Sequence, residues 1–411
     1  MNSLEPVLSK TGFELLESFK NLPYCRELAQ RLNRGLRQRG VAPKLVAAVL
    51  TQLELREAAR VKFGDFAREM LFTREGLEQA TRLSVAAVHA GRYRDAGCTH
   101  VADLGCGLGA DSLALAGVGL KVTAYERDEQ TAAAALLNLR AFPEATVTQA
   151  DVTATDWNLL RRSGIDGVFA DPARRDQRGR RLEPRSWSPP LPLVLSWRRE
   201  VPHENLGIKA APGINYRELP ADCEAQWISV GSELVEAGIW LGDLRHTTGR
   251  TALLLDAQGH TIANLRDESR AAANAAAAVA HSLDSEDALG EMLWEPDDAI
   301  IRAGLLAQVA AKTGSKCLSP RIAYLSGDPG SRAWGKRFSV QKVLPLDAKK
   351  IRAALKGREV RSLEVKKRGA AISPAKLRQE VLPKAVTDGE DLTLIATRIA
   401  GRHRAILAKR L

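Results

Sequence analysis

Residues 101–111 read Val-Ala-Asp-Leu-Gly-Cys-Gly-Leu-Gly-Ala-Asp, an apolar run that continues into a glycine-rich turn. The run is typical of a buried β-strand, and Asp103 stands just before the first glycine. Gly105, Gly107 and Gly109 allow the backbone to turn sharply with positive φ and to approach a ligand without an intervening Cβ. The stretch therefore predicts a strand, a ligand-binding turn and the start of a helix.

The glycine turn fits two kinds of cofactor, and Asp103 distinguishes them. Gly105-x-Gly107-x-x-Ala110 also satisfies the relaxed fingerprint of NAD and FAD sites. A dinucleotide places its pyrophosphate on such a turn, where a carboxylate would repel it. S-adenosylmethionine instead carries an ammonium and a sulfonium, which a carboxylate attracts. The turn therefore predicts S-adenosylmethionine, and a dehydrogenase is the weakest alternative. Asp111 is expected first as a cap of the following helix and second as a ligand.

Two further acids follow strand-like segments at the spacing of a doubly wound sheet. Lys121–Tyr125 ends at Glu126, where an acid in such sheets accepts hydrogen bonds from the two ribose hydroxyls. Ala145–Gln149 is followed by Asp151, which is expected to accept a hydrogen bond from the adenine amino group. A single acid after a strand is more often a cap or a solvated loop residue. The recurrence at strand–helix intervals favours the cofactor site.

A fourth apolar segment, Ile165–Ala170, ends in Asp171-Pro172-Ala173-Arg174. Rossmann-type sheets carry their chemistry just outside the carboxyl ends of the strands. We therefore expect Asp171, Pro172 and Arg174 to form the catalytic turn. Asp171 would accept a proton from the methyl acceptor or orient it.

From about Thr73 to Ile262 the chain resembles the class I S-adenosylmethionine-dependent methyltransferases. More narrowly, three motifs are similar to those of a bacterial group with a THUMP-like C-terminal domain, whose members are described as RNA methyltransferases of largely undefined substrate; the motifs are residues 72–81, 88–93 and 171–174. The resemblance implies that the turn Gln79-Ala80-Thr81 holds the methionine end of the cofactor, so that Gln79 and Thr81 join the binding residues.

The sequence departs from better-known relatives at the catalytic turn. Enzymes that methylate exocyclic amines of bases usually carry Asp or Asn, two prolines and an aromatic ring that stacks on a flipped base. Here Ala173 and Arg174 occupy the last two positions. A guanidinium can instead stack on a base or pair with a phosphate. The arginine-rich loop 174–185 is therefore the expected substrate edge, and Trp187 beyond it is expected to be a packing anchor.

Basic residues are concentrated at the C-terminal end. The 411-residue chain has a formal net charge of +11, and Ser331–Leu411 holds 21 Lys or Arg against 7 Asp or Glu. This surplus of 14 leaves the other 330 residues at about −3. Such asymmetry indicates a module for a polyanion. We favour RNA over membrane lipid because the charges alternate with strand-like and helical segments of a folded α+β module: strands 337–344, 360–365 and 392–399, and helices 348–355 and from Pro374.

The predicted fold class is α/β, with a Rossmann-like class I methyltransferase sheet, an N-terminal helical region and a small basic α+β domain. Because one core rarely spans 411 residues, we expect several parts. These are an N-terminal helical region (1–95), a Rossmann-like methyltransferase domain (96–285), a connecting region (286–330) and a basic THUMP-like RNA-binding domain (331–411).

Four local patterns add expectations. Apolar residues that recur in 45–53 predict a helix beginning at Pro43. The alanine-rich run 269–280 predicts a bridging helix. The acidic stretch 284–298 is interpreted as interdomain surface. A basic face near the N-terminus either touches RNA or, more commonly for such faces, is solvated; it comprises Arg31, Arg34, Arg37 and Arg39.

The five cysteines are scattered and include no CxxC pair, so the sequence supports no metal site and indicates a reducing compartment. No apolar run approaches the roughly twenty residues of a membrane span, and the first residues do not resemble a signal peptide. A cytoplasmic enzyme without membrane contact is expected. The sequence sets no oligomeric state.

The hypothesis from sequence is a methyltransferase that transfers a methyl group from S-adenosylmethionine to a nucleotide of tRNA or rRNA. Two alternatives stay open. One is a methyltransferase of a protein or small molecule. The other is a non-catalytic RNA-binding or ribosome-assembly factor that retains the fold.

Overall fold

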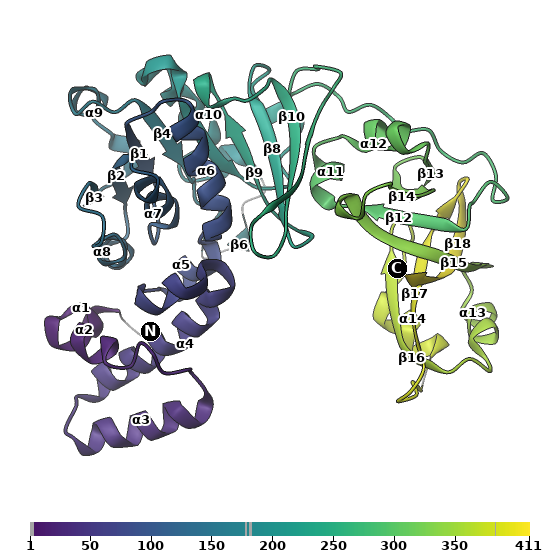
Figure 1. Cartoon of the computed structure of the whole chain (residues 1–411), viewed down its shortest axis with the longest axis horizontal. Helices are drawn as coiled ribbons and strands as arrows, with labels where there is room; N and C mark the ends of the chain where they lie inside the picture. Colours follow the sequence, from purple (N-terminus) through teal and green to yellow (C-terminus); the bar gives the residue numbers. More distant parts are fainter. Residues whose placement is uncertain (1–3, 177–178, 181–182, 383) are drawn as a thin grey trace. The chain divides into compact units, whose positions relative to one another are not determined.

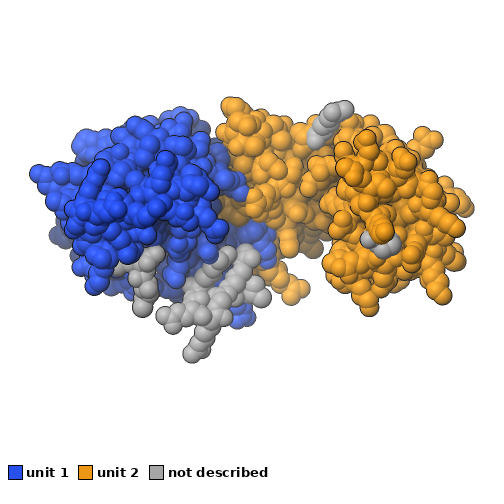
Figure 2. Space-filling view, turned by 90° about the horizontal axis from the view of Figure 1, so that it is seen from below, with its two compact units in different colours: residues 1–214, 238–246 blue, residues 215–237, 247–411 orange. Residues whose placement is uncertain are grey.

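The structure, a computed structural model, describes residues 4–176, 179–180, 183–382 and 384–411 (Figure 1). The chain divides into two units, which Figure 2 shows in blue and orange. The first unit contains residues 1–214 and 238–246, and the second contains residues 215–237 and 247–411.

The first unit opens with helices that follow the expected signals. The predicted helix at Pro43 is confirmed as α4, which begins at that proline and ends before Gly64, whose φ is +56°. Its apolar stripe is buried, with Val49 fully inaccessible. The helices of this region are α1 (Glu5–Leu8), α2 (Lys10–Glu17), α3 (Arg26–Gln38), α4 (Pro43–Phe63), η1 (Gly64–Glu69), α5 (Arg74–Gln79) and α6 (Leu83–Asp95).

The parallel strands of the first unit have the order β7-β4-β1-β2-β3. The glycine-turn strand, β1, lies at the centre of these five, and every one of its residues is buried. This burial on both faces explains its continuous apolar run. The predicted strands are confirmed as β1 (His100–Leu104), β2 (Lys121–Glu126), β3 (Ala145–Gln149) and β4 (Gly167–Ala170), and β7 (Leu206–Ala210) joins them.

Helices alternate with these strands, as a doubly wound sheet requires. They are α7 (Ala110–Gly117), α8 (Glu129–Asn138), α9 (Trp157–Arg162) and α10 (Leu191–Ser196), with a two-stranded ribbon of β5 (Arg175–Asp176) and β6 (Gly179–Arg180). Short 3₁₀ turns lie at η2 (Val152–Ala154), η3 (Pro184–Ser186), η4 (Trp197–Glu200), η5 (Pro202–Glu204), η6 (Tyr216–Glu218), η7 (Gly242–Leu244) and η8 (Arg332–Trp334).

The division between the units falls within β9 (Glu233–Trp240). The full strand order of this sheet is β11-β10-β8-β9-β7-β4-β1-β2-β3. In the second unit, β10 (Gly249–Leu255) pairs in parallel with β8 (Glu224–Val230) and antiparallel with β11 (Thr261–Arg266). The predicted α/β fold class is confirmed.

A second sheet, within the second unit, has the order β13-β14-β12-β15-β18-β17-β16. The strands and helices predicted in the basic module are confirmed. The elements are β12 (Met292–Pro296), α11 (Asp298–Arg302), α12 (Leu306–Thr313), β13 (Lys316–Ser319), β14 (Ile322–Ser326), β15 (Gly335–Pro345), α13 (Ala348–Leu355), β16 (Val360–Lys367), α14 (Pro374–Val381), β17 (Glu390–Ile399) and β18 (Arg402–Arg410).

Two predictions from the sequence differ from the structure of the second unit. The alanine-rich run 269–280 is not helical. The guanidinium of Arg250 donates hydrogen bonds to the carbonyls of Ala273 and Ala275, so tertiary bonds take the acceptors that a helix would use. The stretch 286–330, expected to be a connection, supplies β12, β13 and β14 to the second sheet. Among its acids, Glu286, Glu295 and Asp298 form ion pairs with basic residues of this unit, and Glu295 contacts Lys366 at 2.8 Å.

Candidate functional site

The glycine turn after β1 has the backbone that its sequence predicts. Gly105, Gly107 and Gly109 all have positive φ, at +93°, +55° and +82°. A Cβ on Gly105 would lie 3.1 Å from the carbonyl oxygen of Asp171. A Cβ on Gly107 would meet nothing within 4 Å, so space is open beside the turn. The turn can therefore cradle a ligand, and it brings the predicted catalytic turn close to the first glycine.

Asp103 is completely buried in β1, behind the glycine turn. Ser112 of α7 donates a hydrogen bond to its Oδ2 at 2.5 Å, whereas its Oδ1 is buried without a hydrogen-bond partner among the described residues. Burial and the nearby charge of Asp111 raise the pKa of Asp103 to about 8. A buried carboxyl oxygen without a donor suits a cationic ligand, and this observation fits the ammonium of S-adenosylmethionine.

Glu126 and Asp151 follow neighbouring strands, but their carboxylates accept hydrogen bonds from different kinds of partner. Glu126 accepts hydrogen bonds from the amides of Gly107 and Asp128, at 3.1 and 2.8 Å, and so holds the glycine turn. Each carboxylate oxygen retains a lone pair that can accept from a ribose hydroxyl. Asp151 accepts from the amide and hydroxyl of Thr153 and caps a short 3₁₀ turn, and these bonds lower its pKa. Its adenine contact stays a prediction.

Asp111 does not cap α7, contrary to the first expectation, because Gly109 takes the N-cap position. The side chain of Asp111 is instead buried in the first turn of the helix. It accepts a hydrogen bond from Thr81 at 2.7 Å and lies 2.7 Å from Nδ1 of His89. Burial would raise the pKa of Asp111, but the hydrogen bond and charge of His89, with smaller contributions from neighbouring groups, outweigh it and lower that pKa.

A buried lysine that sequence reasoning missed joins the two predicted turns. Lys209 lies on β7 and is 4% exposed. Its ammonium donates to Oδ2 of Asp171 at 2.8 Å, to the hydroxyl of Thr81 at 2.8 Å and to the carbonyl of Gln79 at 3.2 Å. The signal in the sequence is a lysine inside the apolar strand Leu206–Ala210, since a buried ammonium requires partners.

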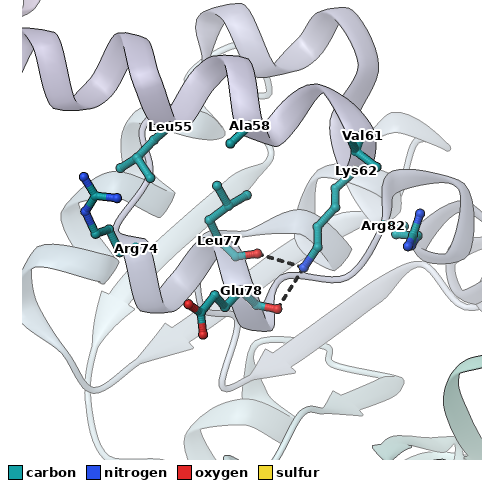
Figure 3. Close-up of a pocket in the computed structure, with 8 residues that line it drawn as sticks. All are labelled: Leu55, Ala58, Val61, Lys62, Arg74, Leu77, Glu78 and Arg82. Atoms are coloured by element: carbon teal, nitrogen blue, oxygen red, sulfur yellow. Dashed lines mark hydrogen bonds between the residues drawn. The ribbon is translucent and has the colours of Figure 1, made fainter. Parts of the chain in front are cut away.

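A second lysine holds the same turn from α4. The ammonium of Lys62 donates to the carbonyls of Leu77, Glu78 and Ala80, at 2.8, 2.9 and 2.9 Å, and Figure 3 shows the first two bonds. These carbonyls end α5, where unpaired acceptors and the helix dipole favour a cation. Between them, Lys62 and Lys209 bind the four consecutive carbonyls from Leu77 to Ala80. The turn that contains Gln79 is therefore fixed.

A groove of about 550 Å³ lies beside this turn, between α4 and α5 (Figure 3). Its walls combine apolar side chains with cations: Leu55, Ala58, Val61, Lys62, Arg74, Leu77, Glu78 and Arg82. None of the residues that the sequence predicts for the cofactor or for catalysis lines it.

The turn predicted to be catalytic, residues 171–174, lies within the described residues. Asp171 has a side chain that is 26% exposed, Pro172 is buried and Arg174 is half-buried. Its backbone is held by hydrogen bonds between Ala173 and Ser188, at 2.8 and 3.0 Å. Trp187 is 2% exposed, which confirms it as a packing anchor. Of the arginine-rich loop, Arg178 and Arg181 lie outside the described residues.

The thiols near the site are not poised as nucleophiles. Burial, with the charges of Asp103 and Glu126, raises the pKa of Cys106 well above its ordinary value, and burial raises the pKa of Cys98 to about 12. Across the described ranges, no three His, Cys, Asp or Glu side chains gather as metal ligands. No helix among the described residues is long and apolar enough to cross a membrane.

Comparison with known proteins identifies the chain. It is 31% identical over 372 residues to an uncharacterized S-adenosylmethionine-dependent methyltransferase found in two strains of Mycobacterium tuberculosis, and the match covers 87% of this chain and 93% of the relative. The chain belongs to the S-adenosylmethionine-dependent methyltransferases. The methyltransferase is therefore an enzyme that uses S-adenosylmethionine, which confirms the predicted cofactor and sets aside both the dehydrogenase and the non-catalytic alternative.

Two family models and a solved structure also match the chain. Residues 335–410 match a THUMP domain-like family, which confirms the expected C-terminal module. Residues 1–59 match a domain of unknown function. The crystal structure of a Porphyromonas gingivalis protein described as a methyltransferase is 21% identical, with a TM-score of 0.69, and covers 95% of this chain and 100% of its own. At this identity the likeness shows the fold.

Proposed function

We propose that this methyltransferase acts on RNA, with a nucleotide of tRNA or rRNA as the methyl acceptor. The observation that carries the proposal is the folded C-terminal module, because Ser331–Leu411 contains 21 basic and 7 acidic residues. Its match to a THUMP domain-like family points to the same class of partner. A basic, folded surface of this kind gains affinity for RNA by releasing counterions from phosphates. The free cysteines favour the cytoplasm as its compartment.

The cofactor residues are proposed as the sequence assigned them. The glycine turn of Gly105, Gly107 and Gly109 gives the close approach, and Asp103 binds the ammonium of the methionine end. Gln79 and Thr81 hold that end from the other side, on a turn fixed by Lys62 and Lys209. Glu126 binds the ribose and Asp151 the adenine. Three observations support these roles: the unpaired oxygen of Asp103, the hydrogen bond from Gly107 to Glu126, and the hydrogen bonds from Lys209 to Gln79 and Thr81.

Catalysis is proposed to depend mainly on alignment. When bound, S-adenosylmethionine supplies an electrophilic methyl group on its sulfonium. The carboxylate of Asp171 accepts a hydrogen bond from the acceptor and aligns it, while Lys209 fixes the orientation of that carboxylate. Lys209 is thus a positioning residue. Arg174, where relatives carry an aromatic ring, would stack on the target base or pair with a neighbouring phosphate, and Pro172 shapes the turn.

The proposal is tested by transfer of labelled methyl groups into an extract from a strain that lacks the gene. The purified wild-type enzyme and its Asp171→Asn variant are compared, and the extract is then separated into RNA, protein and small molecules. Label in RNA that disappears with the variant supports the proposal. Label confined to protein or small molecules would move the acceptor to the alternative class.

Cofactor binding is measured in the same two proteins. Asp171→Asn is expected to bind S-adenosylhomocysteine within a few fold of wild type, because Asp171 contacts the acceptor and not the cofactor. Equal losses of binding and transfer would remove its assignment to the acceptor.

A further inference from the structure

Helix α3 presents a row of arginines that the proposed mechanism does not use. Five arginines stand within or at the end of the helix, against one acid, Glu27. All five are exposed, and none forms a hydrogen bond or ion pair with a described residue. We name the surface formed by the four arginines within the helix the α3 arginine face; it consists of Arg26, Arg31, Arg34 and Arg37.

Helix geometry gathers these side chains on one side. At about 100° per residue, Arg26, Arg31, Arg34 and Arg37 fall within an arc of roughly 140°. The leucines of the helix lie on the opposite side, and Leu28 and Leu36 are buried. The face is therefore a continuous cationic surface, directed away from the protein's own core.

Among the described residues, no arginine of this face lies within ion-pair distance of an acid, unlike other exposed arginines of the same unit. Glu27, four residues before Arg31, is the one acid whose charge acts on the face. Arg60, Arg68 and Arg94 each lie within ion-pair distance of an acid, at 3.3, 3.4 and 2.9 Å. On α3, neighbouring arginines three residues apart repel one another, which costs a few tenths of a kcal/mol for each pair in the free protein. A bound polyanion would remove this repulsion.

We propose that the α3 arginine face binds the phosphate backbone of RNA, and that this is a function of the N-terminal domain. Guanidinium groups bind phosphates with paired hydrogen bonds, and a helix face that carries four arginines and a single acid, Glu27, complements a polyanion. RNA is favoured over an anionic membrane because a helix that lies on lipid needs an exposed apolar side, whereas the leucines of α3 pack against its own unit. The inference rests on the proposed function, since it assigns a second contact to the same RNA.

The test is the binding of bulk tRNA by the full-length protein over a range of salt concentrations. The variant is Arg31→Gln/Arg34→Gln/Arg37→Gln, in which glutamine keeps the helix propensity. The matched control, Arg60→Gln/Arg68→Gln/Arg94→Gln, removes the same charge from exposed arginines that are paired with acids. Because each lost phosphate contact lowers the salt slope by about 0.7 to 0.9, the α3 variant is expected to lose roughly 2 from the slope and at least about tenfold in affinity.

Three outcomes overturn the proposal, and they separate it from the proposed function. If both variants bind tRNA equally well while wild type methylates RNA, the arginine face has no role and the enzyme's substrate class stands. If wild type neither binds nor methylates RNA, both proposals fall. If the α3 variant keeps tRNA binding but loses binding to vesicles that contain phosphatidylserine, the partner is a lipid surface.

Discussion

The ammonium of Lys209, on β7, lies 2.8 Å from Oδ2 of Asp171, which follows β4, and also 2.8 Å from the hydroxyl of Thr81. One buried cation therefore connects the turn assigned to the cofactor with the turn assigned to the acceptor. Lys62 binds the first of these turns through three hydrogen bonds to carbonyls at the end of α5. Substitutions of the two lysines can therefore separate cofactor binding from methyl transfer.

We expect Lys209→Met and Lys62→Met to differ in their effect on methyl transfer. Both variants loosen the turn at Gln79 and should weaken S-adenosylhomocysteine binding by up to about tenfold. Only Lys209→Met releases Asp171, and a misplaced catalytic group typically costs about 100-fold in rate. Transfer to RNA at saturating cofactor should therefore fall roughly 100-fold in Lys209→Met and stay near wild type in Lys62→Met.

A conservative variant sharpens this comparison. Lys209→Arg keeps a cation beside Asp171 and should recover part of the transfer rate, whereas a purely structural role predicts no recovery from a larger side chain in a buried position. Equal transfer rates in the two methionine variants, measured at saturating cofactor, would contradict the positioning role.

Cofactor affinity should rise with pH through the titration of Asp103. The pKa of this carboxyl is raised to about 8, so the group carries a proton at neutral pH in the free enzyme. Binding the ligand's ammonium favours the carboxylate, and the proton is released. The affinity for S-adenosylhomocysteine is therefore expected to increase by up to about tenfold per pH unit between pH 6 and about 8, and then to level off.

Calorimetry in buffers of different ionisation enthalpy measures that proton release directly. Asp103→Asn should bind more weakly and show no such pH dependence. Wild-type affinity that does not change from pH 6 to pH 8 would refute the ammonium contact.

The same titration affects the stability of the fold. Because the folded pKa lies above the ordinary value of 3.8, the contribution of Asp103 to the free energy of unfolding is fully present below about pH 4. It is lost as the pH rises through about 8.

Asp111 should stabilise the fold, with the opposite dependence on pH. Its pKa is lowered, so its contribution is present above the ordinary value of 3.8 and is lost as the pH falls through the folded value. Asp111→Asn removes the carboxylate that lies 2.7 Å from buried His89, and loss of one member of a comparable buried pair costs about 3 kcal/mol. Urea unfolding followed by circular dichroism should show this loss at pH 7 and a smaller one near pH 3.5. Unchanged stability at pH 7 would show that the pair contributes nothing.

Gly105→Ala should damage the site through its backbone. The residue has a φ of +93°, and the added Cβ would lie 3.1 Å from the carbonyl of Asp171. Strain of this kind costs about 1–3 kcal/mol and would displace the catalytic turn. Thermal unfolding and S-adenosylhomocysteine binding should both fall. The matched control is Gly35→Ala in α3, where a Cβ meets nothing within 4 Å and helix propensity predicts a gain of up to about 1 kcal/mol.

The sequence by itself determined the strands, the glycine turn and the kind of cofactor, because these follow from local patterns. A buried parallel strand requires a continuous apolar run, and a turn with three positive φ values requires glycine. The helices and strands of the basic module could likewise be predicted from the sequence. Alternation of apolar and polar residues in strands, and helix signals such as Ser373 before Pro374, depend only on neighbouring residues.

Only the tertiary structure decided which side chains share a hydrogen bond across distant segments. Lys209, Thr81 and Asp111 come from three separate segments of the chain, and no local pattern in the sequence relates them. Asp111 looked like a helix cap until the fold placed it against His89, and the alanine-rich run looked helical until Arg250 took its carbonyls. In each case a buried polar group required a hydrogen-bond partner. Leaving such a group unpaired costs more free energy than the local helix or capping preference contributes.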